Sequence, residues 1–167
     1  KPSSAASDVY KRQIKYGVAM ANTIVDDLTI MNANEWDWWT ACSYGTYTDG
    51  LIYLDEDNHE NLDFSKRYYC LGNFSKFIKE GAVRVACSSG VKNVRSVAFV
   101  NEDNTVVTVY VNNNDKKAYT TIDCEGDYAV YTTDRDNDIA KTDFGKAKKV
   151  KVSLPASSVV TVVYEAK

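Results

Sequence analysis

The fold class is decided by the stretch Val94-Arg95-Ser96-Val97-Ala98-Phe99-Val100-Asn101, which a short acidic segment joins to a second run at residues 105–112. Both runs are rich in valine with Ser and Thr interspersed, and from these runs onward Val and Thr recur with a period of two that is typical of strands with one dry and one wet face. The joining segment, Glu102-Asp103-Asn104, carries a turn signal. The pattern therefore predicts an antiparallel β-hairpin.

The same period of two extends from Gly81 almost to the end of the chain. Further turn signals fall at residues 112–115, 125–127 and 143–145, and Pro155 lies between two expected strands, where it costs no ladder hydrogen bond. The expected strands are residues 83–88, 94–101, 105–112, 118–124, 128–133, 148–154 and 158–165. Short strands at this spacing predict an antiparallel β-sandwich over residues 82–167.

Upstream of Gly81 the pattern is helical. Apolar residues recur at spacings of three and four over residues 14–31 and 65–79, which predicts two amphipathic helices. Between them, the aromatic run 36–41 predicts a strand, and a brief extended piece at 51–54 precedes an acidic loop at 55–63. A single strand between two helices needs neighbouring strands on both edges. Residues 14–81 are therefore expected to be the end of a larger α/β unit.

Composition and length narrow the class of protein. The chain has 167 residues, with 20 Lys and Arg against 23 Asp and Glu, and so a net charge of −3. This mild acidity argues against a nucleic-acid partner, and the apolar stretches are too short for a membrane helix, which needs about 20 residues. A complete (β/α)8 barrel takes about 250 residues, so the chain has room for only part of one.

The first 13 residues are polar and aperiodic. They contain no apolar core of the kind that a signal peptide carries. Residues 8–13 back-translate to a sequence like the end of a sequencing adapter. We therefore expect residues 1–13 to be either a flexible leader or an assembly scar in a metagenomic gene.

The sequence contains no strong metal-binding or redox motif. The four cysteines, Cys42, Cys70, Cys87 and Cys124, include no pair with two residues between them, so buried thiols are favoured over a zinc site, while a disulfide framework stays open. Asp134, Asp136 and Asp138 alternate like the start of an EF-hand loop, but the glycine and the glutamate that such a loop needs are missing. His59 lies in the acidic loop without a recognisable catalytic partner. No metal or cofactor is expected.

Several motifs resemble one known family. Residues 69–85, which include Phe74-Ser75-Lys76-Phe77-Ile78-Lys79-Glu80-Gly81, resemble the final barrel helix of glycoside hydrolase family 30 and its exit into the side β-sandwich. The run Glu35-Trp36-Asp37-Trp38-Trp39-Thr40-Ala41 resembles the eighth barrel strand of that family. Residues 94–101 and 154–161 resemble strands of its sandwich. The resemblance covers about residues 14–165, and it implies the last helix–strand–helix of a (β/α)8 barrel followed by an antiparallel β-sandwich.

The family resemblance also implies an activity. Family 30 contains retaining glucosylceramidases, glucuronoxylanases and endo-β-1,6-galactanases, with two catalytic glutamates on the fourth and seventh barrel strands, both upstream of the matched segment. Residues 47–53 look nearest to the endo-β-1,6-galactanase-like branch. Within this chain, Glu35 and Asp37 are the only tempting pair of acids. Two residues apart on a strand, they lie roughly 6.6–6.8 Å apart on one line and cannot flank a scissile bond from two sides.

Three aromatic residues are the candidate substrate contacts. Trp39 corresponds to the family tryptophan at the end of strand eight that lines the subsite of the reacting sugar, and packing between helix and strand is the alternative. Tyr44 and Tyr47 follow in the loop at the same face of the barrel, where such loops carry function. Trp36 and Trp38 have the opposite parity and are expected to pack in the core.

These observations lead to one functional hypothesis and one alternative. The first is that the chain is part of a retaining glycoside hydrolase for a β-linked polysaccharide, inactive alone, from a secreted or cell-surface bacterial parent, with carbohydrate as its partner. The alternative is a stand-alone carbohydrate-binding or structural β-sandwich. If the two helices are cut off from their barrel, their apolar stripes should be exposed and promote self-association.

Overall fold

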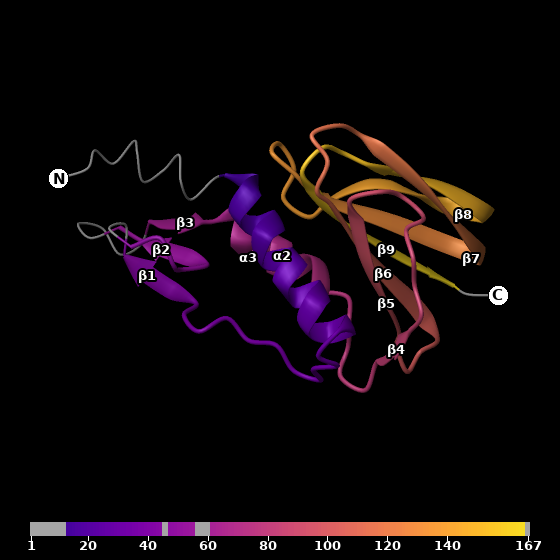
Figure 1. Ribbon diagram of the computed structural model, residues 1–167, viewed down its shortest axis with the longest axis horizontal. Coiled ribbons are helices and arrows are strands. Elements are labelled where there is room, and N and C mark those ends of the chain that lie inside the picture. The colour runs from indigo at the N-terminus through magenta and orange to yellow at the C-terminus, as the bar shows by residue number, and fades with distance from the viewer. Residues whose placement is uncertain (1–12, 45–46, 56–60, 166–167) are drawn as a thin grey trace.

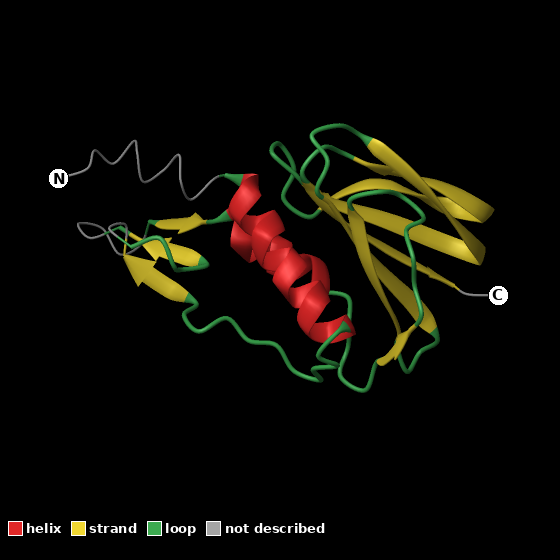
Figure 2. Ribbon diagram, viewed as in Figure 1, coloured by secondary structure: helices red, strands yellow, loops and turns green. Residues whose placement is uncertain are grey.

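The computed structural model describes residues 13–44, 47–55 and 61–165. Figures 1 and 2 show two helices lying between a small sheet and a large, strongly bent sheet. The small sheet has the order β1-β2-β3 and the large sheet the order β4-β5-β6-β9-β7-β8. The elements are α2 (Ile14–Thr29), β1 (Cys42–Tyr44), β2 (Ile52–Leu54), β3 (Leu62–Phe64), α3 (Lys66–Ser75), β4 (Val83–Val85), β5 (Val94–Val100), β6 (Thr105–Asn112), β7 (Ala118–Thr133), β8 (Ala140–Leu154) and β9 (Ser158–Glu165).

Both expected helices are present and end earlier than predicted. Helix α3 begins after Ser65, whose side chain accepts a hydrogen bond from the backbone N–H of Tyr68, as an N-cap does. It ends at Ser75 rather than at residue 79. Asn101 explains the early end, because its side chain accepts from the Lys79 N–H at 3.0 Å and donates to the Phe77 carbonyl at 3.1 Å. These contacts bind backbone groups in a turn that the helix would otherwise have continued through.

The apolar stripe of α2 is buried against the large sheet. Val18, Ala21 and Val25 are buried, and they pack in one cluster with inward-facing side chains of β5, β6 and β9. The expectation that this stripe would be exposed is wrong, because the sheet presents a valine-rich face to it. The sheet residues in this cluster are Val97, Phe99, Val107, Val109, Val111 and Val159. Self-association would have to use other apolar residues, such as the exposed Ile30 and Met31.

The large sheet forms the predicted antiparallel β-sandwich by bending over itself. The second half of β7 pairs with both β8 and β9, whereas its first half pairs with β8 alone. The first half of β7 and the end of β8 contribute Ile122, Cys124, Val150, Val152 and Leu154 to a second apolar cluster. That cluster also holds Tyr110 of β6 and Val160 and Val162 of β9. Alternate residues of β6 and β9 thus face the helices on one side and the β7–β8 layer on the other.

Strands β6 and β9 have the predicted bounds, but the turn signals at residues 125–127 and 143–145 are wrong. Gly126, expected in a turn, lies within β7, with φ 147° beside a register shift that marks a β-bulge. Gly145, also expected in a turn, lies within β8 and pairs with Tyr128. Glycine at these positions lets two long strands bend instead of reversing. The chain reverses between β7 and β8 instead, where the Asp134 carboxylate accepts from the backbone N–H groups of Asp136 and Asn137.

The small sheet differs most from the sequence-based expectation. Residues 36–41, predicted as a strand, form no strand, and the pairing begins only at Cys42. Strand β1 runs parallel to β2, which matches the extended piece predicted at 51–54. Strand β3 begins at Leu62, within the stretch expected to be an acidic loop. A run of aromatic residues becomes a strand only where a neighbour satisfies its backbone groups, and that condition is not visible in the sequence.

Candidate carbohydrate-binding site

Trp36 and Trp38 form the inner side of the segment that precedes β1. Their rings stack with centroids 6.2 Å apart, and both pack against the core cluster of the helices. The Trp36 indole N–H donates to an Asp27 carboxylate oxygen at 2.9 Å, and that of Trp38 donates to the Asp49 carbonyl at 2.6 Å. The prediction that both tryptophans pack inward is confirmed.

Arg67 of α3 ties the small sheet to the helices. Its Nη2 donates to the Gly50 carbonyl at 3.2 Å, to the Tyr53 hydroxyl at 3.0 Å and to the Thr48 carbonyl. The guanidinium also lies 5.4 Å from the centroid of the Trp38 ring. Burial raises the pKa of Tyr53, and the nearby Arg67 charge opposes that rise. One cation therefore holds the loop after β1, strand β2 and the inner tryptophan together.

Trp39 faces the opposite way from its two neighbours, and its side chain is 76% exposed. Tyr44, at the end of β1, and Tyr47 are exposed as well, and the Tyr47 N–H donates to the Tyr44 carbonyl at 3.0 Å. The structure thus brings the two tyrosines into one turn, with Trp39 on the segment just before β1.

The acidic candidates do not form a catalytic pair. Glu35 and Asp37 are both exposed on the segment before β1, and His59 lies outside the described residues. Asp134 accepts from backbone N–H groups, and an oxygen of Asp138 accepts from the buried Lys66 ammonium at 2.6 Å. The Asp134 contacts hold the β7–β8 turn together, and the Asp138 contact ties this turn to α3. Among the residues that the structure describes, no three His, Cys, Asp or Glu side chains gather as a metal site requires.

Two further features are the state of the four cysteine thiols and the hydropathy of the two helices. All four thiols are free, with Cys42 exposed, Cys70 and Cys124 buried and Cys87 between these extremes. Burial raises the pKa of the Cys70 and Cys87 thiols, so neither is set up as a nucleophile. Neither α2 nor α3 has the length and hydropathy that crossing a membrane would take.

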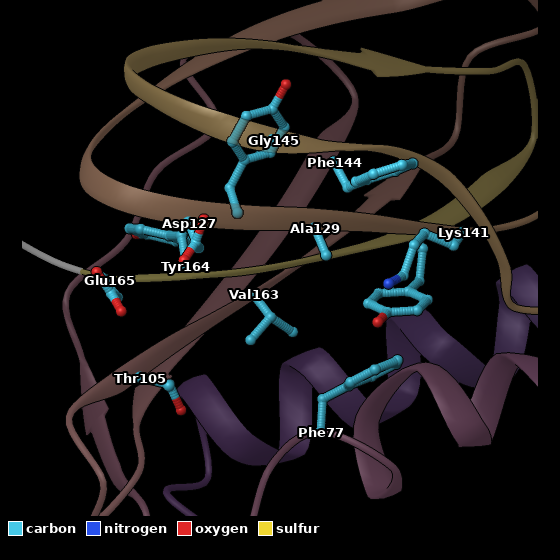
Figure 3. Close-up of a pocket in the computed structure, with 12 residues that line it drawn as sticks. Phe77, Thr105, Asp127, Ala129, Lys141, Phe144, Gly145, Val163, Tyr164 and Glu165 are labelled. Carbon is cyan, nitrogen blue, oxygen red and sulfur yellow. The ribbon is translucent and has the colours of Figure 1, made fainter.

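Sequence reasoning missed a concave surface that lies on the sandwich, away from the three candidate aromatic residues (Figure 3). It is a cavity of about 420 Å³ between β7, β8, β9 and the turn after α3. Phe144 projects into it and is 70% exposed. The residue had been placed in a turn because Gly145 follows it. The available signal was a large aromatic residue in the lysine-rich run 141–149, which otherwise contains only small and polar residues.

Two family descriptions match different parts of the chain. "Glycosyl hydrolase family 30 beta sandwich domain" matches residues 81–162, and "O-Glycosyl hydrolase family 30" matches residues 4–53. The second match begins inside the stretch expected to be a leader, of which residues 1–12 lie outside the described part. The first covers the strands of the large sheet, and the second covers α2, the tryptophans and β1.

Several solved structures share the fold over most of this chain. A family 30 subfamily 8 xylanase from Clostridium acetobutylicum matches with 27% identity and a TM-score of 0.79, over 93% of this chain and 40% of that one. A conserved exported protein from Bacteroides fragilis matches with 26% identity and a TM-score of 0.77, over 98% and 35%. Xylanase C from Talaromyces cellulolyticus matches with 25% identity and a TM-score of 0.74, over 90% and 35%. The chain therefore spans about two fifths or less of these structures.

Proposed function

Because this chain belongs to glycoside hydrolase family 30, we propose that it takes part in the hydrolysis of a β-linked polysaccharide. In this proposal it supplies one wall of the sugar-binding site, made by Trp39, Tyr44 and Tyr47, and the side sandwich that supports the barrel. The observation that carries the proposal is the position of Trp39. It is an exposed indole on a segment whose two neighbouring tryptophans are fixed inward.

The chemistry of a sugar suits this indole. One face of a pyranose ring carries C–H groups and packs flat on an aromatic ring, while the hydroxyls remain free to hydrogen-bond around it. The inner contacts of Trp38 and Arg67 fix the backbone beside Trp39. An indole held in place before the sugar arrives loses less conformational entropy on binding than a mobile one would. Tyr44 and Tyr47 would extend the contact to a neighbouring sugar unit.

We further propose that this chain alone cleaves no glycosidic bond. Retaining hydrolysis needs two carboxylates about 5–5.5 Å apart on either side of the bond, one of them protonated. Glu35 and Asp37 are exposed neighbours on one segment and do not meet that requirement. The catalytic pair would come from barrel strands of the parent enzyme. Such an enzyme would work outside the cell, where its polymeric substrate is, and one of the similar structures is described as an exported protein.

Two polysaccharides are the leading substrates. The two similar xylanases, at 25–27% identity, favour xylan. The sequence of residues 47–53 favours β-1,6-galactan instead. A turnover assay of the chain on both polymers and on aryl glycosides should give no product above the blank, and any turnover would disprove the proposed inactivity.

Tryptophan fluorescence tests the role of Trp39 directly. Titration with xylohexaose and with β-1,6-linked galactohexaose should shift the emission of the wild-type chain, with a Kd on the order of 1–10 mM because one wall of a site binds weakly. Trp39→Phe should abolish the shift. Trp36→Phe removes an indole from the inner side and is the matched control, which should retain the shift. An equal response in the wild-type chain and in Trp39→Phe would refute the role of Trp39.

A further inference from the structure

The groove on the sandwich has two chemically different ends (Figure 3). Phe144 and Lys141 lie at one end, and Thr105, Asp127 and Glu165 lie at the other. Val163 and Ala129 form an apolar floor between them. The groove lies on β7, β8 and β9, across the two helices from β1, the strand that follows Trp39 in the chain (Figure 1).

The aromatic end combines a packed pair of rings with a third ring that stays exposed. The Phe77 and Tyr131 rings pack with centroids 4.4 Å apart, and the Lys141 ammonium lies 5.6 Å from the Tyr131 centroid and 5.5 Å from the Phe144 centroid. Phe144 nevertheless remains 70% exposed. An exposed phenyl ring adds no buried apolar area to the core, so the free energy that its burial would contribute to folding is not gained. Its position over a cavity therefore indicates a ligand surface.

The polar end supplies hydrogen-bond acceptors. Ionised carboxylates such as Asp127 and Glu165 can only accept, and a pair of sugar hydroxyls can donate to both oxygens of one carboxylate. Both residues are exposed, and Asp127 has only a solvent-exposed partner, the Lys146 ammonium at 3.5 Å. The charged residues lining the groove are Asp127, Glu165 and Lys141, so the lining carries one more negative than positive charge. That balance disfavours an anionic ligand.

We propose that this groove binds a neutral, hydroxyl-rich segment of polysaccharide at a site separate from Trp39. A sugar ring stacks on Phe144 while the hydroxyls of a neighbouring unit donate to Glu165 and Asp127. This inference takes one premise from the proposed function, namely that the ligand is a polysaccharide. A second site of this kind would hold the polymer close to the enzyme between cleavage events, because binding at one site raises the effective concentration at the other.

Affinity electrophoresis of the whole chain in gels that contain neutral arabinoxylan or β-1,6-galactan tests the groove. The wild-type chain should be retarded, Phe144→Ala should lower the affinity at least tenfold, and Glu165→Gln should lower it about threefold. Tyr119→Ala is the matched control: this exposed aromatic residue lies on β7 beneath Lys151 and outside the groove, and its removal should change nothing. The affinity should be the same in 50 mM and 500 mM salt.

Four results would overturn the proposal, of which the first three concern the groove alone. They are the absence of retardation by either polymer, equal retardation of the wild-type chain and Phe144→Ala, and an affinity that collapses at 500 mM salt, which would indicate a charged ligand. Loss of retardation in Trp39→Ala but not in Phe144→Ala would also overturn it and would favour the Trp39 site. Because no tryptophan lines the groove, the fluorescence titration can fail while the groove still binds, so the two proposals fail independently.

Discussion

The two sheets on either side of the helices are held together by different means. Strands β1, β2 and β3 have three residues each, whereas β6 and β9 have eight and are buried along most of their length. The large sheet is stabilised by two apolar clusters, one on each face. Among the described residues, the small sheet has no apolar cluster of its own: Leu51 and Ile52 join the cluster of the helices, and Arg67 adds polar contacts to Gly50 and Tyr53.

This difference separates the helices and the large sheet, which form the stable part of the molecule, from the small sheet, which lies beside the candidate binding residues. The helices share their main apolar cluster with the large sheet, so helices and sandwich should unfold together. The small sheet is short: Tyr44 at the end of β1 is exposed, and Tyr53 of β2 is its one fully buried aromatic residue among those that the structure describes. Binding surfaces are commonly drawn from such weakly stabilised parts of a fold.

The largest expected difference between the two sheets is in the rate of amide hydrogen exchange. Amides of β6 and β9 should exchange only on global unfolding, because their hydrogen bonds lie between two buried faces. Amides of β1, β2 and β3 should exchange at least ~1000-fold faster, which corresponds to about 4 kcal/mol less local stability. Mass spectrometry of peptides from a native-state exchange series measures both sets.

Helix α2 serves as the internal reference in the same experiment. If the helices belong with the sandwich, protection in α2 should follow that of β6. Equal and strong protection in both sheets would contradict the comparison, because the small sheet would then belong to the same cooperative unit.

Asn73 is the polar centre of the contact between α3 and the sandwich. It is fully buried, its Nδ2 donates to the Thr161 hydroxyl at 2.9 Å, and its Oδ1 accepts from the Thr133 hydroxyl at 2.5 Å. The Thr161 hydroxyl in turn donates to the Asn73 carbonyl at 2.7 Å. The network joins one helix to β7 and β9 and leaves none of these groups unsatisfied. It therefore specifies how the helix sits on the sheet.

Replacement of Asn73 by alanine should cause the second-largest effect. It removes the acceptor of the buried Thr133 hydroxyl, which then keeps the Ile139 N–H as its partner, and it removes one partner of the Thr161 hydroxyl, so the free energy of unfolding should fall by about 2–4 kcal/mol. Urea denaturation followed by circular dichroism measures this loss. Asn113→Ala, at an exposed asparagine that pairs with Asn22, is the control and should cost less than ~0.5 kcal/mol. A small effect of Asn73→Ala would mean that α3 is only loosely attached to the sandwich.

The sequence predicts the sandwich better than the barrel portion for a physical reason. Turn signals and strand-forming residues mark where β6 and β9 begin and end, so both have the predicted bounds, but the predicted wet face is wrong for them because both lie between two layers and are buried on both faces. The bends in β7 and β8 could not be predicted, because Gly126 and Gly145 suit a turn and a bulge equally well. The burial of the α2 stripe was also missed, because a stripe shows that a helix packs and not which sheet it packs against.

The candidate functional residues likewise include some that the sequence predicts and some that it does not. Parity along residues 36–39 separates the inward Trp36 and Trp38 from the exposed Trp39, so this part of the site follows from sequence alone. The sandwich groove does not, because Phe77, Phe144 and Glu165 come from distant segments that only the bent sheet brings together. Arg67 was missed too, since nothing local marks a cation in a helix as the clamp of a loop 14–19 residues away.

Replacement of Arg67 by methionine should cause the smallest global effect and the most local one. Methionine keeps an apolar stem but removes the donors to Gly50 and Tyr53. Global unfolding free energy should fall by less than ~0.5 kcal/mol, while exchange in β2 should become about tenfold faster, as for the loss of one hydrogen-bonding group of about 1.4 kcal/mol. The pKa of Tyr53 should rise further, because the guanidinium charge that opposes the effect of burial is gone.

Arg84→Met provides the matched control for this test, since Arg84 lies exposed on β4 and its guanidinium donates to the Asn32 side chain at 2.9 Å. It should leave exchange in β2 unchanged. If Arg67→Met instead lowered the global stability by more than ~1 kcal/mol, the small sheet would unfold with the sandwich. The aromatic residues around β1 would then be held by the same cooperative unit as the core, and the separation of a stable support from a weakly held binding surface would fail.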